Sequence, residues 1–317
     1  MSETRQDGPT LVTGAAGFAG CWLVAALRAR GERVVGLSRR AGWPEEWKSL
    51  DAPLVPCDLL DGPALARVLD EVRPARVYHL AGFASPGASL RNPEAAWDGN
   101  LTATRRLCDA LLKRPARLLF VGSGLVYGQR ARIDEETPFR PETPYAASKA
   151  AADLACAQMA RASGLDAVIA RPFNHTGPHQ PAGYAIPDFA RQLAAIERGE
   201  QPPVLEVGDL GAHRDLSDVR DVVAGYALLM ERGQRGEAYN VASGASVPMS
   251  EVLHRLVAHT GLAVEVRTRP GTVPSAPEPV AVETGKLRRL GWSPGYALER
   301  TLADALDAWR AAGRQGR

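Results

Sequence analysis

The stretch Thr10–Gly20 reads Thr-Leu-Val-Thr-Gly-Ala-Ala-Gly-Phe-Ala-Gly, a β-branched run followed by three glycines spaced three residues apart. Such glycines permit a tight turn and let a pyrophosphate approach the free backbone N–H groups at the start of a helix. The next residues, Phe18–Arg30, carry apolar side chains at helical spacing, and Gly31 stands where a left-handed C-cap residue belongs. A generic strand-to-helix turn is the alternative, but the flanking strand and helix favour a dinucleotide site. The residues expected around the pyrophosphate are Gly14, Gly17, Phe18, Ala19 and Gly20.

Short β-branched runs alternate with longer helical patterns through the first half of the chain. This order predicts an α/β fold of the Rossmann type, in which helices cover both faces of a doubly wound parallel sheet. Two long helices are expected at Pro93–Leu112 and Pro144–Ala162. The expected strands are Thr10–Thr13, Arg33–Leu37, a short one before Cys57, Arg76–Leu80, Arg117–Val121 and Asp166–Arg171.

Beyond Arg171 the elements become shorter and are interrupted by Pro, Gly and Arg, for example at Gly177-Pro178. We expect a smaller, mixed α/β C-terminal lobe that binds the substrate. A helical pattern at Val219–Met230 and a strand pattern at Glu237–Val241 predict a return to the main sheet before a last helix at Leu298–Ala311. The expected dinucleotide-binding domain is therefore 1–172, completed by about 217–242, and the expected substrate lobe is 173–216 and 243–317.

The helix expected at Pro144–Ala162 begins with two capping signals, since Thr143 suits the N-cap and Pro144 the first helical position. Its apolar residues cover more than one stripe, so the helix needs a neighbour beyond the sheet. That neighbour is either a second helix of the same chain or a helix of a second subunit, and we expect a homodimer. The apolar residues are Ala146, Ala147, Ala150, Ala151, Leu154, Ala155 and Met159.

Charge balance and cysteine usage limit the classes of function. In 317 residues, 38 Lys and Arg stand against 36 Asp and Glu, and the net charge of +2 gives no global attraction to nucleic acid or to a membrane surface. No apolar run approaches the roughly 20 residues of a membrane span. The four cysteines have no close spacing and the N-terminus does not resemble a signal peptide, so we expect a cytoplasmic protein. His and Cys residues show no metal-ligand spacing, and no metal site is expected.

The end of the second expected strand bears on which dinucleotide is bound. Enzymes that prefer NAD place Asp or Glu about 20 residues beyond the glycine loop, where it binds the ribose 2′-hydroxyl. Here the stretch is Gly36-Leu37-Ser38-Arg39-Arg40, without a carboxylate. Guanidinium groups can pair with a 2′-phosphate, so NADP(H) is favoured over NAD(H), unless Arg39 and Arg40 are only solvated surface charges. Asp58, followed by Leu59, is expected near the adenine.

Tyr145 and Lys149 stand four residues apart at the start of the helix expected at Pro144–Ala162, so both side chains lie on one face. A phenol has a pKa of about 10, and a neighbouring ammonium lowers that pKa toward neutrality, as proton transfer requires. Ser123 follows the strand expected at Arg117–Val121, at the edge where ligands of open α/β sheets collect. We expect Ser123, Tyr145 and Lys149 to be catalytic.

Together these motifs resemble the extended short-chain dehydrogenase/reductase family, whose members act on nucleotide sugars. A narrower resemblance rests on two segments, Arg171–Pro178 and His213–Asp221. They are similar to the sequences of the branch that contains GDP-4-keto-6-deoxy-mannose reductase and GDP-mannose 4,6-dehydratase. The wider resemblance rests on the glycine loop, on His79-Leu80-Ala81-Gly82, on Ser123 with Tyr145 and Lys149, and on Arg171-Pro172-Phe173-Asn174.

The resemblance implies roles for individual residues. Tyr145 is the proton donor, Lys149 binds the nicotinamide ribose, and Ser123 holds the substrate oxygen. A nucleotide-diphosphate sugar is the implied substrate. The implied cofactor site also contains Leu80, Ala81, Gly82, Asn100 and Pro172, and the implied substrate site contains Ser85, Asn174, Arg214 and Arg269.

Two departures from the family pattern bear on the reaction. Dehydratases of this family place acidic residues directly after the equivalent of Ser123, whereas this chain has Gly124 and Leu125, which cannot move a proton. The expected reaction is therefore NADP(H)-dependent reduction of the C4 ketone of a 4-keto-6-deoxy sugar. The reductases also carry an acidic residue soon after the equivalent of Arg269-Pro270, where this chain has Gly271-Thr272. Whether the nucleotide of the substrate is GDP therefore stays open. The alternatives are a UDP-hexose-type 4-epimerase with tightly bound NAD, a 4,6-dehydratase, and a dinucleotide-binding protein without turnover.

Overall fold

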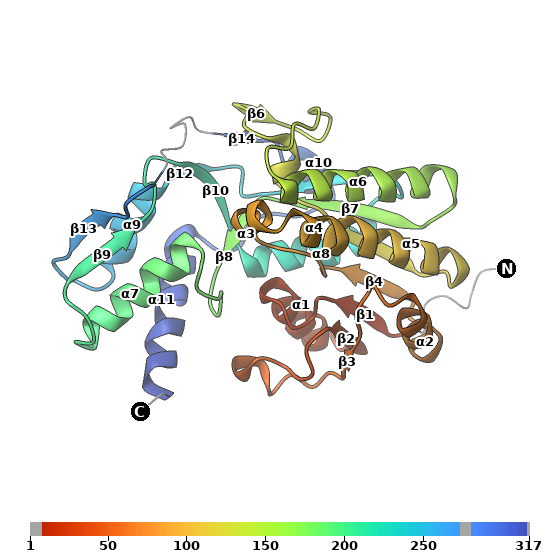
Figure 1. Cartoon of the computed structure of the whole chain (residues 1–317), viewed down its shortest axis with the longest axis horizontal. Helices are drawn as coiled ribbons and strands as arrows, with labels where there is room; N and C mark the ends of the chain where they lie inside the picture. The colour runs from red at the N-terminus through yellow and green to blue at the C-terminus, as the bar shows by residue number, and fades with distance from the viewer. Residues whose placement is uncertain (1–7, 273–279, 316–317) are drawn as a thin grey trace.

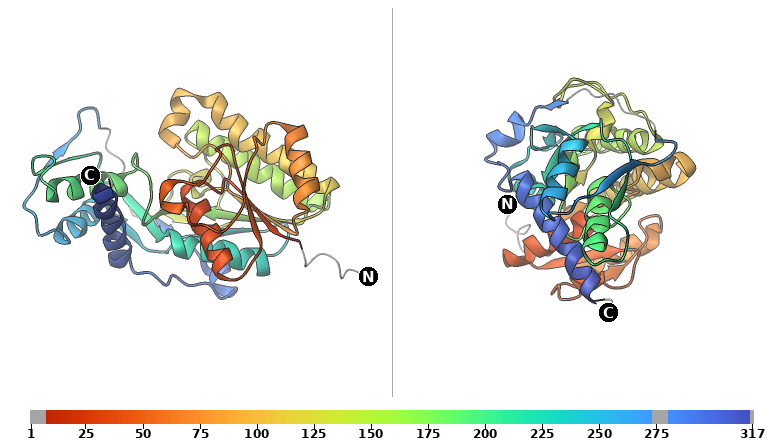
Figure 2. Two further views of the ribbon diagram at one scale, coloured as in Figure 1. Left: turned by 90° about the horizontal axis from the view of Figure 1, so that it is seen from below. Right: turned by 90° about the vertical axis from the view of Figure 1, so that its left-hand side faces the viewer.

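The computed structural model describes residues 8–272 and 280–315 (Figure 1). The ends of the expected domain ranges, 1–7 and 316–317, and the stretch 273–279 lie outside the described residues. The chain forms a large layered body and a smaller lobe beside it, which contains the helices coloured green and dark blue at the left of Figure 2.

The large body is built on a seven-stranded sheet with the strand order β11-β7-β5-β4-β1-β2-β3, and every neighbouring pair is parallel. The direction of chain progression reverses between β1 and β4, the switch point beside which open α/β sheets bind ligands. The predicted Rossmann class is thereby confirmed, with strand ends within one residue of those expected. The strands are β1 (Thr10–Thr13), β2 (Val34–Ser38), β3 (Leu54–Pro56), β4 (Arg76–His79), β5 (Arg117–Val121), β7 (Ala167–Pro172) and β11 (Ala238–Val241).

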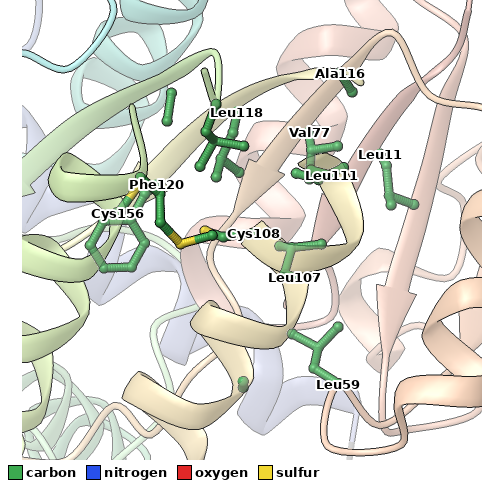
Figure 3. Close-up of a cluster of buried hydrophobic side chains, with 14 of the residues drawn as sticks. Leu11, Leu59, Val77, Leu107, Cys108, Leu111, Ala116, Leu118, Phe120 and Cys156 are labelled. Atoms are coloured by element: carbon green, nitrogen blue, oxygen red, sulfur yellow. The ribbon is translucent and has the colours of Figure 1, made fainter. Parts of the chain in front are cut away.

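Helices cover the two faces of the sheet in separate apolar clusters. On one face lie α2 (Gly62–Val72), α5 (Ala103–Lys113) and α6 (Pro144–Ala162). Figure 3 shows part of this cluster, where Leu107, Cys108 and Leu111 of α5 and Cys156 of α6 meet the strand residues Val77, Leu118 and Phe120. On the other face α1 (Phe18–Ala29) packs against α8 (Val219–Arg232). Because α8 and β11 follow the first part of the smaller lobe, the chain does return to the main sheet.

The prediction of a single helix at Pro93–Leu112 is wrong in the middle of that range. There α4 (Pro93–Trp97) and α5 are joined by η2 (Asp98–Thr102), a turn with π-helical hydrogen bonding. A π-helical turn holds one residue more than an α-helical turn, so it changes the direction of its side chains relative to the helix on either side. The buried Asn100 lies in this turn.

The long helix α6 begins as the capping signals predict. Thr143 Oγ1 accepts a hydrogen bond from the backbone N of Ala146 at 3.2 Å, and Pro144 takes the first helical position. The helix packs against α5, α4, η2 and α3 (Pro86–Arg91), so a neighbour from the same chain is present. Leu154 nevertheless stays 60% exposed on its outer side.

The smaller lobe has an apolar core of its own. In it α7 (Ala185–Glu197), α9 (Met249–Ala258) and α11 (Leu298–Gln315) pack against one another, and α7 also contacts β9 (Val204–Val207). The last helix, α11, ends at Gln315, beyond the expected end at Ala311. In the part of the chain that the structure describes, no helix is apolar and long enough to cross a membrane. The remaining elements are η1 (Glu45–Trp47), η3 (Gly124–Tyr127), β6 (Arg132–Ile133), β8 (Asn174–Thr176), β10 (His213–Asp218), β12 (Ser246–Pro248), β13 (Glu265–Thr268), β14 (Ala281–Val282) and α10 (Gly285–Arg289).

Candidate active site

The glycine loop joins β1 to α1 at the carboxyl edge of the sheet. Gly14 has a φ of +70°, and a Cβ there would lie 2.6 Å from the backbone N of Ala81. A Cβ at Gly20 would overlap the carbonyl oxygen of Gly14. Gly17 is the N-cap of α1, and no side chain caps that helix, which begins with Phe18 and Ala19. The loop therefore leaves backbone N–H groups at a helix N-terminus open to a pyrophosphate, and these residues fit a dinucleotide.

The end of β2 carries the residues expected to choose between the two nicotinamide dinucleotides. Ser38 is the last residue of β2, and its Oγ accepts from the backbone N of Arg40 at 3.0 Å. The side chains of Arg39 and Arg40 are exposed, and neither forms an ion pair with another described residue. Both guanidinium groups are therefore accessible to a phosphate. Asp58 follows β3 and accepts from the backbone N of Leu60 at 2.9 Å, whereas the side chain of Leu59 is buried in the core.

Ser123 and Tyr145 meet where β5 ends and α6 begins. Ser123 lies close enough to the Tyr145 hydroxyl for its side chain to lower the pKa of that phenol by hydrogen bonding. Ser123 Oγ also accepts from the backbone N of Leu125 at 3.2 Å, which fixes its direction. Ser89, which the sequence reasoning missed, accepts from the backbone N of Tyr145 at 3.1 Å and donates to Pro86 O at 2.6 Å. The short helix α3 thereby fixes the place at which α6 begins.

The acidity of Tyr145 differs from the expectation. Burial raises the pKa of Tyr145, and the hydrogen bond with Ser123 opposes that rise. The ammonium of Lys149 is engaged elsewhere. Its Nζ donates instead to the carbonyl oxygen of Val121 at 2.9 Å. A spacing of four residues puts both side chains on one helix face, but the hydrogen bond at its tip decides where the ammonium points.

Lys149 and Asn100 converge on one glycine. A Cβ at Gly82 would lie 3.4 Å from Lys149 Nζ and 2.6 Å from Asn100 Oδ1, so only glycine lets both approach. Asn100 Oδ1 accepts from the backbone N of Phe83 at 2.9 Å, and its Nδ2 donates to Ser148 Oγ at 2.9 Å. Burial lowers the pKa of Lys149 to about 8. The expected group of Gly82, Asn100 and Lys149 is therefore assembled in one place.

A buried ion pair lies behind Lys149 and was also missed. Arg171 Nε donates to Asp153 Oδ2 at 2.8 Å and its Nη2 donates to Asp153 Oδ1 at 3.0 Å. The negative charge of Asp153 opposes the lowering of the Lys149 pKa. The one signal in the sequence is that Asp153 stands four residues beyond Lys149, one helical turn further along the same face.

The remaining expected site residues lie on several elements. Asn174 begins β8 and is exposed. Arg214 lies on β10, where its Nη1 donates to His213 O at 2.8 Å and burial lowers its pKa. Arg269 follows β13, where its Nη2 donates to the carbonyl oxygen of Glu206 at 3.2 Å. Arg214 thus lies in one sheet of the smaller lobe, and Arg269 directly follows a strand of another. The others are Leu80 and Ala81 directly after β4, Ser85 at the N-cap of α3, and Pro172 at the end of β7.

Tyr184 is a further residue that the sequence reasoning did not single out. It is the N-cap of α7 in the smaller lobe, and its Oη lies 3.5 Å from the carbonyl oxygen of Ala84 in the loop after β4. Tyr184 also contributes to raising the pKa of Tyr145. Across the described ranges, no three His, Cys, Asp or Glu side chains are grouped so as to hold a metal ion.

Comparison with known proteins agrees with this geometry. The chain matches the NAD dependent epimerase/dehydratase family over residues 10–242. GDP-6-deoxy-D-mannose reductase of Pseudomonas aeruginosa is 34% identical over 314 residues, which cover 96% of this chain and 98% of that protein. The structure of RMD from Pseudomonas aeruginosa complexed with NADPH has a TM-score of 0.82 at 32% identity and covers 96% of this chain and 99% of its own. For UDP-glucose 4-epimerase of Thermus thermophilus complexed with NAD, the TM-score is 0.86 at 30% identity, with coverage of 96% and 99%. The chain therefore belongs to the NAD dependent epimerase/dehydratase family of enzymes, as its motifs predict.

Proposed function

We propose that this protein reduces the C4 ketone of a nucleotide-linked 4-keto-6-deoxy sugar, with NADPH as the reductant. The observation that carries the choice of reduction is the contact between Gly124 and Phe173. A Cβ at Gly124 would lie 2.8 Å from atoms of the Phe173 ring. The first of the two positions at which dehydratases of this family carry an acid, that of Gly124, therefore has no room for one in this packing. The similarity to GDP-6-deoxy-D-mannose reductase supports the same choice.

The side chains at the carboxyl edge of the sheet suit this reduction. Because burial raises the pKa of Tyr145, its phenol is protonated before the reaction and can donate that proton to the C4 oxygen. Ser123, whose side chain acts on the Tyr145 hydroxyl, donates to the same oxygen as negative charge develops on it. Bound NADPH would supply the hydride to C4. Lys149, whose Nζ lies beside Gly82, binds the nicotinamide ribose.

The choice of NADPH over NADH rests on the end of β2. Arg39 and Arg40 are exposed, and the stretch from Gly36 to Arg40 contains no carboxylate to accept a ribose 2′-hydroxyl. Two guanidinium groups next to Ser38 favour a 2′-phosphate. The NADPH complex of the similar Pseudomonas aeruginosa structure supports this choice.

A nucleotide-sugar 4-epimerase is the second candidate. It is favoured by the similarity to UDP-glucose 4-epimerase of Thermus thermophilus and by Gly271-Thr272, where reductases of the family carry an acidic residue. An epimerase oxidises and reduces the same sugar, so it keeps its nicotinamide, whereas a reductase must exchange it in every turnover.

Two measurements separate the candidates. The first is NADPH oxidation, followed by absorbance, with GDP-, UDP- and dTDP-linked 4-keto-6-deoxy sugars. The second is the nicotinamide content of the purified protein after dialysis. We expect steady NADPH consumption with one of these sugars and a dialysed protein without nicotinamide. Retained NAD, together with interconversion of C4 epimers and no net NADPH consumption, would replace the reductase with the epimerase.

Three further features belong to the same proposal. We assign 1–172 with about 217–242 to the dinucleotide and 173–216 with 243–317 to the substrate, supported by the glycine loop in the large body and Arg214 in the smaller lobe. A cytoplasmic location is supported by four cysteines that are all free. A homodimer is supported by large apolar side chains exposed on α3 to α6, namely Leu90, Trp97, Leu112 and Leu154.

A further inference from the structure

His79 is a completely buried residue that the proposed reaction does not use. It ends β4, and its imidazole joins two other elements. Nδ1 lies 2.7 Å from Oγ1 of Thr13 at the end of β1, and Nε2 lies 2.9 Å from Oγ1 of Thr104 in α5. The ring therefore ties the switch point of the sheet to the helix that follows η2.

The hydroxyl of Thr104 decides which ring nitrogen carries the proton. Thr104 Oγ1 donates its single proton to the carbonyl oxygen of Asn100, 2.5 Å away. It can only accept from Nε2, so Nε2 is protonated and Nδ1 accepts from the Thr13 hydroxyl. Thr13 Oγ1 also accepts from the backbone N of Ala81 at 3.2 Å, which leaves its own proton for Nδ1. Burial lowers the pKa of His79 to about 3, so the ring is neutral at physiological pH.

The hydrogen bonds continue from Asn100 to the start of α6. The Asn100 side chain donates to Ser148 Oγ at 2.9 Å, and Ser148 Oγ donates in turn to the carbonyl oxygen of Tyr145 at 2.9 Å. The ring N–H of His79 and the hydroxyls of Thr104 and Ser148 thus each donate to one acceptor. A ring protonated on Nδ1 would set two acceptors against each other at Nε2 or force Thr104 to release Asn100.

We propose that His79 is a positioning residue whose Nε2–H tautomer holds η2, and through Asn100 holds Tyr145 and Lys149 in their reacting places. Because its side chain is completely buried, it acts through its neighbours. A shift of η2 moves Asn100 from Gly82, against which Lys149 also lies. The roles of Tyr145 and Lys149 rest on the proposed function, but the tautomer of His79 does not depend on the reaction.

The first test reads the tautomer directly. The full-length protein is labelled with ¹⁵N-histidine, and a long-range ¹H–¹⁵N spectrum is recorded at neutral pH. We expect one histidine with a protonated Nε2 and an unprotonated Nδ1, assigned by its loss in His79→Gln. A protonated Nδ1 at that histidine overturns the proposal, whether or not the protein proves to be a reductase.

The second test separates positioning from general structural damage. Gln at position 79 can place an amide N–H near the site of Nε2, whereas Asn is too short to reach Thr104. We expect His79→Asn and Thr104→Val each to lower kcat by about 10- to 100-fold, as small misplacements of reacting groups do, with little change in KM for NADPH. The variants His79→Gln and Thr104→Ser should recover most of that loss.

A double-mutant cycle and a matched control complete the design. Because both substitutions cut one chain of hydrogen bonds, His79→Asn with Thr104→Val should lower kcat no further than either alone. His254→Gln, an exposed histidine on α9, is the control. Equal losses in the Gln and Asn variants, additive losses in the double variant, or losses that follow the melting temperature would each overturn the proposal.

Discussion

Gly124 and Phe173 lie so close together that a Cβ on the glycine would come within 2.8 Å of three ring atoms. The Phe173 ring also stacks with Tyr127, at a centroid distance of 6.2 Å and an angle of 16°, and this contact restrains its movement. Tyr127 is itself held by Asn240, to which its hydroxyl donates at 2.8 Å. The missing acid after Ser123 is therefore a matter of packing as well as of sequence.

Gly124→Ala should destabilise the protein by about 1–3 kcal/mol, because the added methyl forces Phe173 or the backbone to move. Urea denaturation measures this loss, and NADPH oxidation should fall with it because Ser123 is the neighbouring residue. The matched control is Gly62→Ala in the first turn of α2, where a Cβ meets nothing within 4 Å. If Gly124→Ala is as stable and as active as the wild type, the ring has room and the argument against dehydration fails.

Tyr145→Phe should lower NADPH oxidation by about 10²- to 10⁴-fold, since it removes the proton donor. The bond from the backbone N of Tyr145 to Ser89 is unaffected by the change, so the cofactor site should stay intact. Fluorescence titration should therefore give an unchanged dissociation constant for NADPH. Tyr296→Phe, at an exposed ring, is the control. Weaker NADPH binding with normal turnover would contradict the assigned role.

Lys149→Met should stabilise the protein at neutral pH. The pKa of Lys149 falls from 10.5 to about 8 on burial, so the folded state binds fewer protons than the unfolded state between these values, and wild-type stability rises with pH there. Removing the ammonium should therefore add up to about 3 kcal/mol below that window, with a gap that narrows as the pH rises through it. Urea denaturation at several pH values checks this, and a gap that widens with pH would show the opposite sign.

Replacing Arg39 and Arg40 together with Ala should weaken NADPH binding by about 10- to 100-fold, the usual effect of losing hydrogen bonds to a charged group. Binding of NADH, which has no 2′-phosphate, should hardly change. Isothermal titration with both dinucleotides measures the two affinities. The control is Arg300→Ala, which removes an exposed arginine from α11 of the smaller lobe. Equal losses for NADPH and NADH would mean that these arginines do not read the 2′-phosphate.

Leu154→Glu should convert the proposed homodimer into a monomer, because it places a charge on the exposed outer side of α6. Sedimentation equilibrium gives the mass of both proteins. The control is Val266→Glu, at an exposed apolar residue of β13 in the smaller lobe. A wild-type protein that sediments as a monomer would remove the dimer from the proposal, and a dimeric Leu154→Glu would move the interface elsewhere.

Local signals in the sequence predict much of this structure. The glycine loop, the strands of the main sheet and the start of α6 at Thr143 and Pro144 each depend on neighbouring residues, whose conformational preferences are strong. Once these elements are placed, Ser123 after β5 and Tyr145 at the start of α6 are both expected at the carboxyl edge of the sheet. No further signal in the sequence is needed for that prediction. The turn η2 was not predicted, because its residues would suit an α-helix. Its extra residue serves only to place Asn100 against Gly82, a contact that the local sequence does not report.

Contacts between distant segments account for what could not be predicted. Ser89 meets the backbone of Tyr145 across 56 residues, and Thr13 meets His79 across 66. No periodicity reports such pairs. The hydrogen bond from Lys149 to the carbonyl oxygen of Val121 was not predicted for a related reason, since helical spacing fixes Cβ positions but not which acceptor an ammonium four bonds further out will find.

The late arrival of α8 and β11 has a consequence for synthesis of the protein. A ribosome that has released only the first 172 residues has made six of the seven strands, but α1 still lacks its partner α8 and the edge of β7 is unpaired. The nascent chain therefore exposes an apolar surface until about residue 241 has emerged. A truncated or transplanted version of this nucleotide-binding unit must therefore include α8 and β11.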